Sequence, residues 1–224
     1  MSAKALVAEA LGTFLFFFVG AGSVLVLSAT GSDPNAGLLV VAAAHGLALA
    51  VLVSALGAIS GGHFNPAVTF GLVVAGKVTP LTGAGYWIAQ LLGGALAGYA
   101  LVVLVGPIHP AVPKLLEDVT AVQGTAIEAI LTAVLLLAVF GTAVDPRGPK
   151  IGGLAIGLAV FADILLGGTL TGAAMNPARW FGMALWDGPA WDNAWVWIVG
   201  PLAGAAVVGL AYRYLFAPET EAAT

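Results

Sequence analysis

The chain has no cysteine and very little charge. None of its 224 residues is Cys, and only 8% are charged. The absence of Cys excludes a disulfide framework and thiolate metal sites, while the redox compartment stays open. Seven Lys and Arg residues against eleven Asp and Glu residues give a net charge of -4. This charge carries no information about nucleic acid, and we expect no nucleic-acid partner. So few charges leave little surface suited to water.

Apolar residues and glycine are abundant instead. The chain is 60% hydrophobic and contains 31 glycines, and a helix that crosses a bilayer needs ~20 apolar residues. The first apolar stretch is too long for the core of a cleaved signal peptide, so we interpret it as a span. The sequence predicts an all-α membrane protein that forms one domain over residues 1–224. Six stretches are long enough to span, at residues 5–28, 37–58, 82–106, 123–144, 151–169 and 194–216.

Basic residues predict the orientation. Five basic residues that flank the spans fall on one side of the membrane: Lys4, Lys77, Arg147, Lys150 and Arg213. Lys114 is the single basic residue in the loops of the opposite side. Since Lys and Arg are enriched in cytoplasmic loops, both termini are expected in the cytoplasm. The short tails favour a cell membrane, inner or plasma, as the location of this multi-pass protein.

The motif Asn-Pro-Ala occurs twice, beginning at Asn65 and at Asn176, within an internal repeat. Gly46 precedes the first motif by the same distance as Gly157 precedes the second, and Glu9 and Glu128 occupy similar places upstream. Trp87 and Trp197 follow the two motifs at nearly equal distances. The predicted repeats cover residues 1–107 and 120–224. Three spans in each are an odd number, so the repeats must be inverted in the membrane.

Each motif lies in a segment that is too short and too rich in glycine to cross the membrane, residues 59–76 and 170–186. Asn caps helix N-termini and Pro suits the first helical position, so a half-helix should begin at each motif. Broken backbone at membrane depth is tolerated when it is buried in protein or lines a water-filled cavity. The two positive helix ends would meet near the midplane, with both asparagine amides free to donate. The sequence therefore predicts a pore or a midplane binding site.

Two segments resemble the signatures of the aquaporins, or major intrinsic proteins: Ser60 to Thr69, and Met175 to Arg179. The similarity extends over essentially the whole chain. It implies the aquaporin fold, a homotetramer in the lipid bilayer, and one pore per subunit for water and small neutral solutes. The pore motifs would be Asn65, Pro66, Ala67, Asn176, Pro177 and Ala178.

The selectivity of such a pore has a physical explanation. Two converging positive helix ends and the Arg179 guanidinium would repel a cation, while a neutral molecule that exchanges hydrogen bonds would pass. Asn65 and Asn176 would orient the passing oxygen and interrupt a chain of waters that relays protons. The alternative for Arg179 is a structural ion pair, since a charge inside a membrane is costly without a partner or a task.

The resemblance also assigns the narrow outer filter, to His45, Ile164, Ala173 and Arg179. This set is similar to that of plant tonoplast intrinsic proteins, some of which conduct ammonia as well as water. Ile164 adds an apolar wall and Ala173 leaves room opposite, so we expect a passive channel for water and ammonia that excludes protons and ions. A facilitator of glycerol or other small neutral solutes stays the alternative, although Trp180 replaces the Asp that such facilitators carry.

The three histidines each have two interpretations. His45 is a filter residue or a polar residue at a helix interface. By resemblance, His63 lines the cytoplasmic vestibule, although a structural role in the loop would also explain it. His109 lies in the long loop after the third span, where similar channels place a histidine beside the filter; otherwise it is an ordinary exposed loop residue.

Three acids fall within the apolar segments. Glu9 and Glu128 recur in the repeat, and a carboxylate there can accept backbone N–H groups of the re-entrant loops that lipid cannot satisfy. Proton transfer is the alternative role. Asp163 lies ~100° of helix rotation from Ile164 and is expected to face a neighbouring span or subunit.

Other function classes find little support. No cluster of metal ligands and no nucleotide-binding loop is present, so we expect no enzyme activity, no metal and no cofactor. An ion-coupled secondary transporter shares inverted repeats and broken helices. It would need acids at the midplane, where this chain has neutral Asn65 and Asn176 beside a cation.

Overall fold

The computed structural model describes residues 2–31 and 33–218, and within these ranges it contains helices and no strand. Its eight α-helices are α1 (Ala3–Thr30), α2 (Pro34–Ser60), α3 (Pro66–Val74), α4 (Pro80–Leu104), α5 (Ala121–Val139), α6 (Leu154–Gly167), α7 (Pro177–Ala184) and α8 (Val196–Ala211). The π-helical turns η2 (Phe140–Val144) and η4 (Tyr212–Phe216) extend α5 and α8, and η1 (His109–Ala111) and η3 (Gly188–Trp191) are 3-10 turns. The predicted all-α class and both half-helices, α3 and α7, are confirmed.

The predicted fifth span is shorter than expected. In the described part of the chain, α1, α2, α4 and the extended helices α5 and α8 are long and apolar enough to cross a membrane. The segment 151–169 is helical only over Leu154–Gly167, about 21 Å at 1.5 Å per residue. Glycines at both ends of this segment, Gly152–Gly153 and Gly167–Gly168, favour turns over helix.

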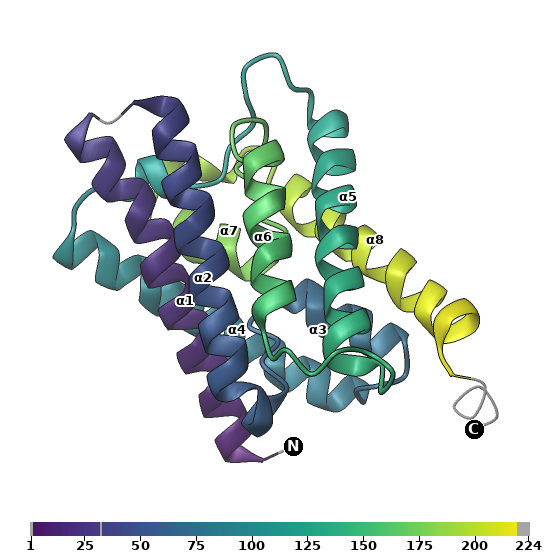
Figure 1. Cartoon of the computed structure of the whole chain (residues 1–224). Helices are drawn as coiled ribbons and strands as arrows, with labels where there is room; N and C mark the ends of the chain where they lie inside the picture. Colours follow the sequence, from purple (N-terminus) through teal and green to yellow (C-terminus); the bar gives the residue numbers. More distant parts are fainter. Residues whose placement is uncertain (1, 32, 219–224) are drawn as a thin grey trace.

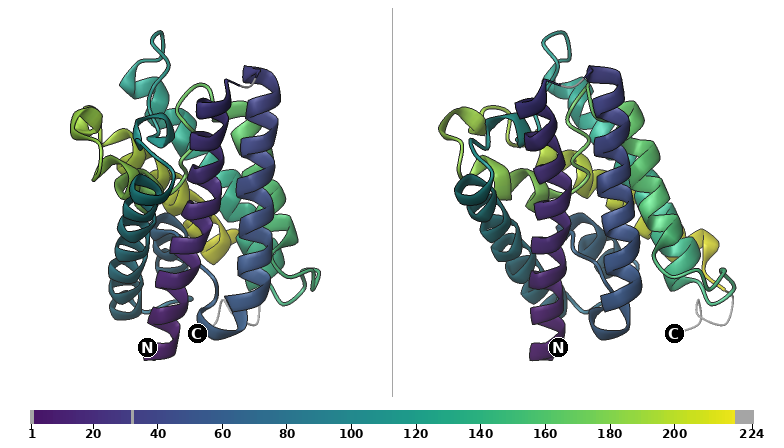
Figure 2. Two further views of the ribbon diagram at one scale, coloured as in Figure 1. Left: turned by 90° about the vertical axis from the view of Figure 1, so that its left-hand side faces the viewer. Right: turned by 60° about the vertical axis from the view of Figure 1, so that its left-hand side comes forward.

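Each half of the chain forms one group of helices, and the half-helices link the groups. In the first half α1 packs on α2 and α4, and in the second α5 packs on α6 and α8. Each half-helix packs mainly on the last helix of the opposite half, α3 on α8 and α7 on α4. Figures 1 and 2 show that α1 begins and η4 finishes at the same end of the bundle, called the terminal end below.

Two glycines allow α2 and α6 to cross in direct backbone contact. A Cβ atom on Gly46 would lie 2.6 Å from the carbonyl oxygen of Gly157, and a Cβ on Gly157 would overlap the oxygen of Gly46. Small residues permit such close approach of membrane helices. The glycines that marked the repeat in the sequence therefore join the two halves.

Candidate functional site

The side chains of Asn65 and Asn176 begin α3 and α7 and then reach across to the opposite half. Asn65 Oδ1 accepts the backbone N–H of Ala67 (2.7 Å), and its Nδ2 donates to the carbonyl oxygen of Met175 (2.8 Å). Asn176 Oδ1 accepts from Ala178 (3.0 Å), and its Nδ2 donates to the oxygen of Phe64 (3.0 Å). The two helix N-termini are thus fixed to each other.

This crossed arrangement corrects one prediction. We expected both asparagine amides to be free to donate toward the lumen, but one of the two N–H groups of each amide is occupied by the opposite loop. Each side chain keeps a single N–H for a passing molecule. Both residues line the same cavity.

The buried carboxylates Glu9 and Glu128 hold the two loops in matching ways. Glu9 accepts the Ser60 hydroxyl (2.6 Å) and the backbone N–H groups of His63 (3.0 Å) and Phe64 (2.7 Å). Glu128 accepts the corresponding groups, which belong to Thr171 (2.6 Å), Ala174 (3.0 Å) and Met175 (2.7 Å). These contacts are the ones expected of loop acceptors, and they occupy both oxygens of each acid.

The same contacts orient four carbonyl groups away from the two acids. The peptide bonds of the described residues are trans, so each carbonyl points opposite the N–H of its own peptide unit. Since the N–H groups of His63 and Phe64 point at Glu9, the carbonyls of Gly62 and His63 point away from it. In the second half, the carbonyls of Ala173 and Ala174 are oriented in the same manner, and all four residues line the cavity.

The cavity has a volume of ≈ 290 Å³ and opens toward the terminal end, beside Lys77 and Val144. A second cavity of ≈ 650 Å³ lies under the loop that joins α4 to α5. His45, Ile164 and Arg179 line both cavities, and Ala173 lines the first only. The structure therefore places three of the four predicted filter residues where the two cavities meet, and the fourth, Ala173, on the wall of the first cavity. Opposite the polar groups, the wall of the first cavity is apolar and includes Phe16, Leu49, Val68, Leu72, Leu135, Val139, Ile156 and Val160.

His45 and Arg179 are connected at this junction. His45 Nδ1 lies 2.9 Å from the carbonyl oxygen of Val41, so we assign the proton to Nδ1. The Nε2 atom then accepts a long hydrogen bond of 3.5 Å from Arg179 Nε. Arg179 Nη1 donates to the oxygen of Ala111 (2.9 Å). These partners are an imidazole and a carbonyl rather than a carboxylate, so they do not correspond to the alternative of a structural ion pair.

His63 lies on the wall of the first cavity, close to α4. Its Nδ1 is 3.0 Å from the Thr69 hydroxyl, and its ring contacts Tyr86 edge-on at a centroid distance of 5.0 Å. Thr69 also accepts from Gln90 Nε2 (2.9 Å) and donates to the oxygen of Asn65 (3.0 Å). His63 thus lines the cavity and is also part of the loop's hydrogen-bond network.

The structure places His109 away from the junction. Its side chain is 61% exposed, and its Nδ1 lies 2.8 Å from Asp187 Oδ2. His109 lines neither of the two cavities described above, although its neighbours Pro110 and Ala111 line the second one. The predicted position of this histidine beside the filter is therefore not the one that the structure shows. The loop reaches Arg179 through a backbone oxygen instead.

One aromatic pairing differs from the sequence interpretation. Trp197 donates to the oxygen of Thr171 (2.9 Å), and the matching donor in the first half is the hydroxyl of Tyr86, which donates to Ser60 (2.7 Å). The sequence pairing of Trp87 with Trp197 was wrong by one residue, because Trp87 donates to Pro66 instead. Trp180 is 1% exposed and stacks on Trp197 at 5.8 Å.

Asp163 is 4% exposed, and its Oδ2 atom has no hydrogen-bond partner within the described residues. The sequence left a neighbouring span or a neighbouring subunit open, and the burial of Asp163 inside a single chain favours the span. Asp163 is not among the residues that line the first cavity, although the adjacent Ile164 is.

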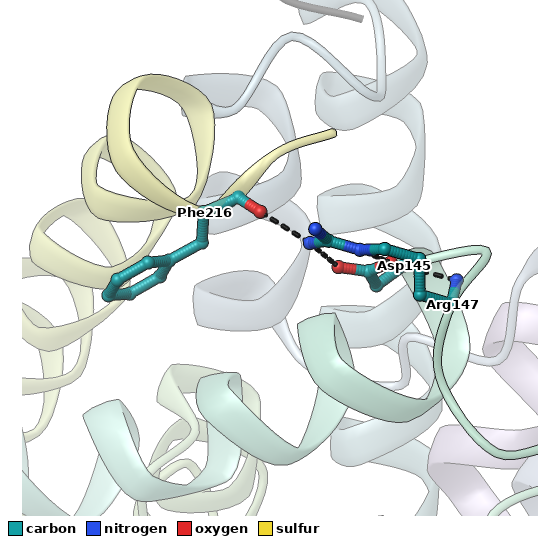
Figure 3. Close-up of polar contacts among 3 residues, drawn as sticks. All are labelled: Asp145, Arg147 and Phe216. Atoms are coloured by element: carbon teal, nitrogen blue, oxygen red, sulfur yellow. Dashed lines mark hydrogen bonds and ion pairs between the residues drawn. The ribbon is translucent and has the colours of Figure 1, made fainter. Parts of the chain in front are cut away.

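Asp145, Arg147 and Phe216 form a polar latch at the terminal end (Figure 3). None of the three is among the residues that line the two cavities. Arg147 donates to both carboxylate oxygens of Asp145 (2.9 and 2.6 Å) and to the carbonyl oxygen of Phe216 (2.6 Å). These hydrogen bonds hold the pKa of Asp145 at about 2, below its usual value of 3.8. The latch joins the loop after η2 to the end of η4, and sequence reasoning did not anticipate it.

Comparison with known proteins agrees with this geometry. The family model described as major intrinsic protein matches residues 1–212. The chain is 47% identical to Aquaporin TIP4-4 of Zea mays, over 95% of this chain and 86% of that protein, and 42% identical to Aquaporin TIP2-1 of Arabidopsis thaliana, over 98% and 90%. These relatives confirm the resemblance to plant tonoplast intrinsic proteins.

A solved structure supports the fold. The X-ray structure of the aquaglyceroporin from Plasmodium falciparum superposes with a TM-score of 0.82 at 23% identity, and the match covers 95% of this chain and 96% of that one. At this identity the likeness concerns the fold alone. The family model and the relatives show that the chain belongs to the major intrinsic protein family.

Proposed function

We propose that this protein is a passive membrane channel for water and not an enzyme. One observation carries the proposal: two half-helix N-termini, fixed to each other by crossed asparagine amides, lie on a cavity that meets a second cavity at His45, Ile164 and Arg179. The relatives named as aquaporins support the same function.

Water would move along a wall that is polar on one side and apolar on the other. The carbonyls of Gly62, His63, Ala173 and Ala174 would accept hydrogen bonds from water in turn. At the midplane, the remaining N–H of Asn65 and of Asn176 would donate to the water oxygen, so that this molecule cannot accept a proton from its neighbour. The apolar wall keeps water from bonding sideways.

Positive charge would exclude ions. The positive ends of α3 and α7 meet at the two asparagines, and the Arg179 guanidinium lies where the cavities join. A hydrated cation would lose water there without gaining a negative partner, which is costly in a narrow channel. A neutral molecule does not encounter this barrier.

We propose His45, Ile164, Ala173 and Arg179 as the selectivity filter, with ammonia as a second substrate. Both ring nitrogens of His45 are engaged, by Val41 and by Arg179. The ring therefore presents no free donor to the opening, and Ile164 and Ala173 present apolar surface. Guanidinium N–H groups of Arg179 can donate to the nitrogen of ammonia as well as to the oxygen of water.

The remaining predictions are also proposals. We propose a homotetramer in a cell membrane, with both termini cytoplasmic and with repeats at residues 1–107 and 120–224. The matching contacts of Glu9 and Glu128 support the two repeats. The position of Lys77, Arg147 and Arg213 near the terminal end supports the orientation.

The test is to reconstitute the protein in liposomes and to measure osmotic shrinkage and ammonia uptake on the same preparation. We expect both rates to exceed those of empty liposomes. His45→Phe should lower ammonia uptake more than water flux, because it removes the acceptor for Arg179 and adds bulk. Ammonia flux equal to that of empty liposomes would remove the second substrate and leave the water channel.

Two further arms of this experiment address the alternatives. Glycerol uptake comparable to water flux would favour a facilitator of small neutral solutes. Flux that saturates, or that depends on a proton or sodium gradient, would favour an ion-coupled transporter. We expect neither.

A further inference from the structure

The ring of His45 occupies a recess at the junction of the cavities. It is held by the oxygen of Val41 on its own helix and packs edge-on against Phe16 of α1 at a centroid distance of 6.0 Å. Only 5% of His45 is exposed. The remaining side of the recess is formed by Gly20, one turn along α1 from Phe16.

The space beside Gly20 is filled by the His45 ring. A Cβ atom on Gly20 would lie 2.5 Å from Nε2 and 2.8 Å from Cγ of His45, and closer still to Cδ2. Contacts this short are incompatible with the observed ring position. Glycine is less favourable than alanine inside a helix, and the position of the His45 ring explains why glycine is needed here.

The second half of the chain has neither the glycine nor the ring. Matching contacts align α5 of the second half with α1 of the first. Thr13 donates to the backbone oxygen of Glu9, and Thr132 donates to the backbone oxygen of Glu128. The same offset, 128 − 9 = 119, relates Gly20 to Val139. On α2 and α6 the offset of the two motifs, 176 − 65 = 111, relates His45 to Ile156.

The glycine and the histidine therefore occur together in one half, and a valine and an isoleucine occur together in the other. Both Val139 and Ile156 line the first cavity. The clash with the His45 ring belongs to position 20, because a Cβ on nearby Gly22 would meet only Leu101, at 3.2 Å.

We infer that Gly20 is a specificity-determining position, which keeps the His45 ring withdrawn from the opening and thereby sets its width for neutral solutes larger than water. The inference rests on the proposed channel function. A side chain at position 20 pushes the ring away from α1, toward Arg179 and Ile164 at the junction. The opening narrows, and ammonia, methylamine and glycerol are affected in increasing order of size, water least.

The experiment uses Gly20→Ala in proteoliposomes, with Gly22→Ala as the matched control. Osmotic water permeability and methylamine uptake are measured on each, as a ratio that does not depend on the amount of protein inserted. We expect Gly20→Ala to lower the ratio of methylamine to water flux several-fold and Gly22→Ala to leave it unchanged. In a His45→Ala background, Gly20→Ala should have no further effect on the ratio.

The results that would overturn the role of Gly20 can be stated in advance. An unchanged ratio in Gly20→Ala, or the same loss in the His45→Ala background, would overturn it. If Gly20→Ala does not fold, recovery of yield in the double variant with His45→Ala supports the clash with the ring, and no recovery contradicts it. Failure of the proposed function is separate, since the wild-type protein would then conduct no more water than empty liposomes.

Discussion

The two halves of the chain hold their loops with nearly the same hydrogen bonds, but the side chains that they place on the cavities differ. Glu9 and Glu128 hold the loops through equivalent hydrogen bonds, and Asn65 and Asn176 cross over in the same way. At the offset of 111 residues, however, Arg179 corresponds to Val68 and His45 to Ile156. All four line the first cavity.

This difference separates the requirements of the fold from those of selectivity. The backbone of a broken helix inside a membrane must be satisfied in each half, so the acid, the hydroxyl and the capping asparagine occur twice. A barrier to ions is needed only once along the path. The positions equivalent to His45 and Arg179, Ile156 and Val68, are therefore aliphatic. The guanidinium occurs in the second half of the chain only.

The largest effect is expected from removing a loop acceptor. Glu128→Leu leaves three buried donors unsatisfied, at about 1–3 kcal/mol each, which approaches the ~5–15 kcal/mol that stabilises an ordinary domain. We expect Glu128→Leu and Glu9→Leu to abolish the yield of folded protein in detergent. The exposed Asp118→Asn serves as a control. Normal yield with a proton leak would instead favour the proton-transfer role for these acids.

The next effect concerns the charge that distinguishes the halves. Arg179→Val gives the second half the side chain that Val68 has in the first. We expect proton flux, followed with a pH-sensitive dye inside liposomes, to rise about tenfold or more, since ~1.4 kcal/mol of barrier is one factor of ten. Val68→Ala, at the matching position, should leave the liposomes tight to protons. If liposomes with Arg179→Val stayed impermeable to protons, the two helix ends alone would form the barrier to protons.

Local chemistry explains why much of this could be predicted from the sequence. Asn before Pro specifies a helix start wherever it lies, and α3 and α7 do begin there. The role of Glu9 and Glu128 followed from counting backbone donors that lipid cannot satisfy. Features that depend on distant partners could not be predicted: each asparagine amide bonds to a loop more than a hundred residues away.

The errors have physical causes as well. Trp87 and Tyr86 are adjacent aromatic donors, and the sequence does not say which one faces the loop of Ser60. Residues 151–169 are apolar apart from Asp163 and Thr169, but hydropathy does not reveal that paired glycines shorten α6 at both ends. The recess at Gly20 depends on the distance between α1 and α2, which composition does not give.

A smaller effect tests an asymmetry of the loop networks. Gln90 donates to Glu9 (2.8 Å) and to Thr69 (2.9 Å), and its counterpart in the second half is Pro201. Gln90→Leu makes the first network resemble the second. Two lost hydrogen bonds at about 0.6 kcal/mol each inside a membrane protein should lower the melting temperature by a few degrees. Water permeability should not change, and a collapse of yield would show that the two networks are not interchangeable.

The smallest effect is expected at the latch of Figure 3, whose residues line neither of the two cavities. Arg147 lowers the pKa of Asp145 from 3.8 to about 2. A depressed pKa in the folded protein means that the stabilisation is present above pH 3.8 and is lost as the pH falls toward 2. Asp145→Asn should therefore melt slightly below the wild type at pH 6, and the difference should shrink to nothing as both are acidified to about pH 2.

Asp118→Asn again controls for the loss of one exposed negative charge. The latch joins the loop after η2 to η4, and Ala143 and Val144 of η2 line the mouth of the first cavity. Water permeability measured at pH 6 on Asp145→Asn thus separates two roles of the latch. Unchanged flux with lower stability indicates an anchor for the last helix, because the walls of the cavity then keep their positions without it. A change in flux larger than the change in melting temperature implies that the latch holds the mouth open, and the second half would then control both ends of the path.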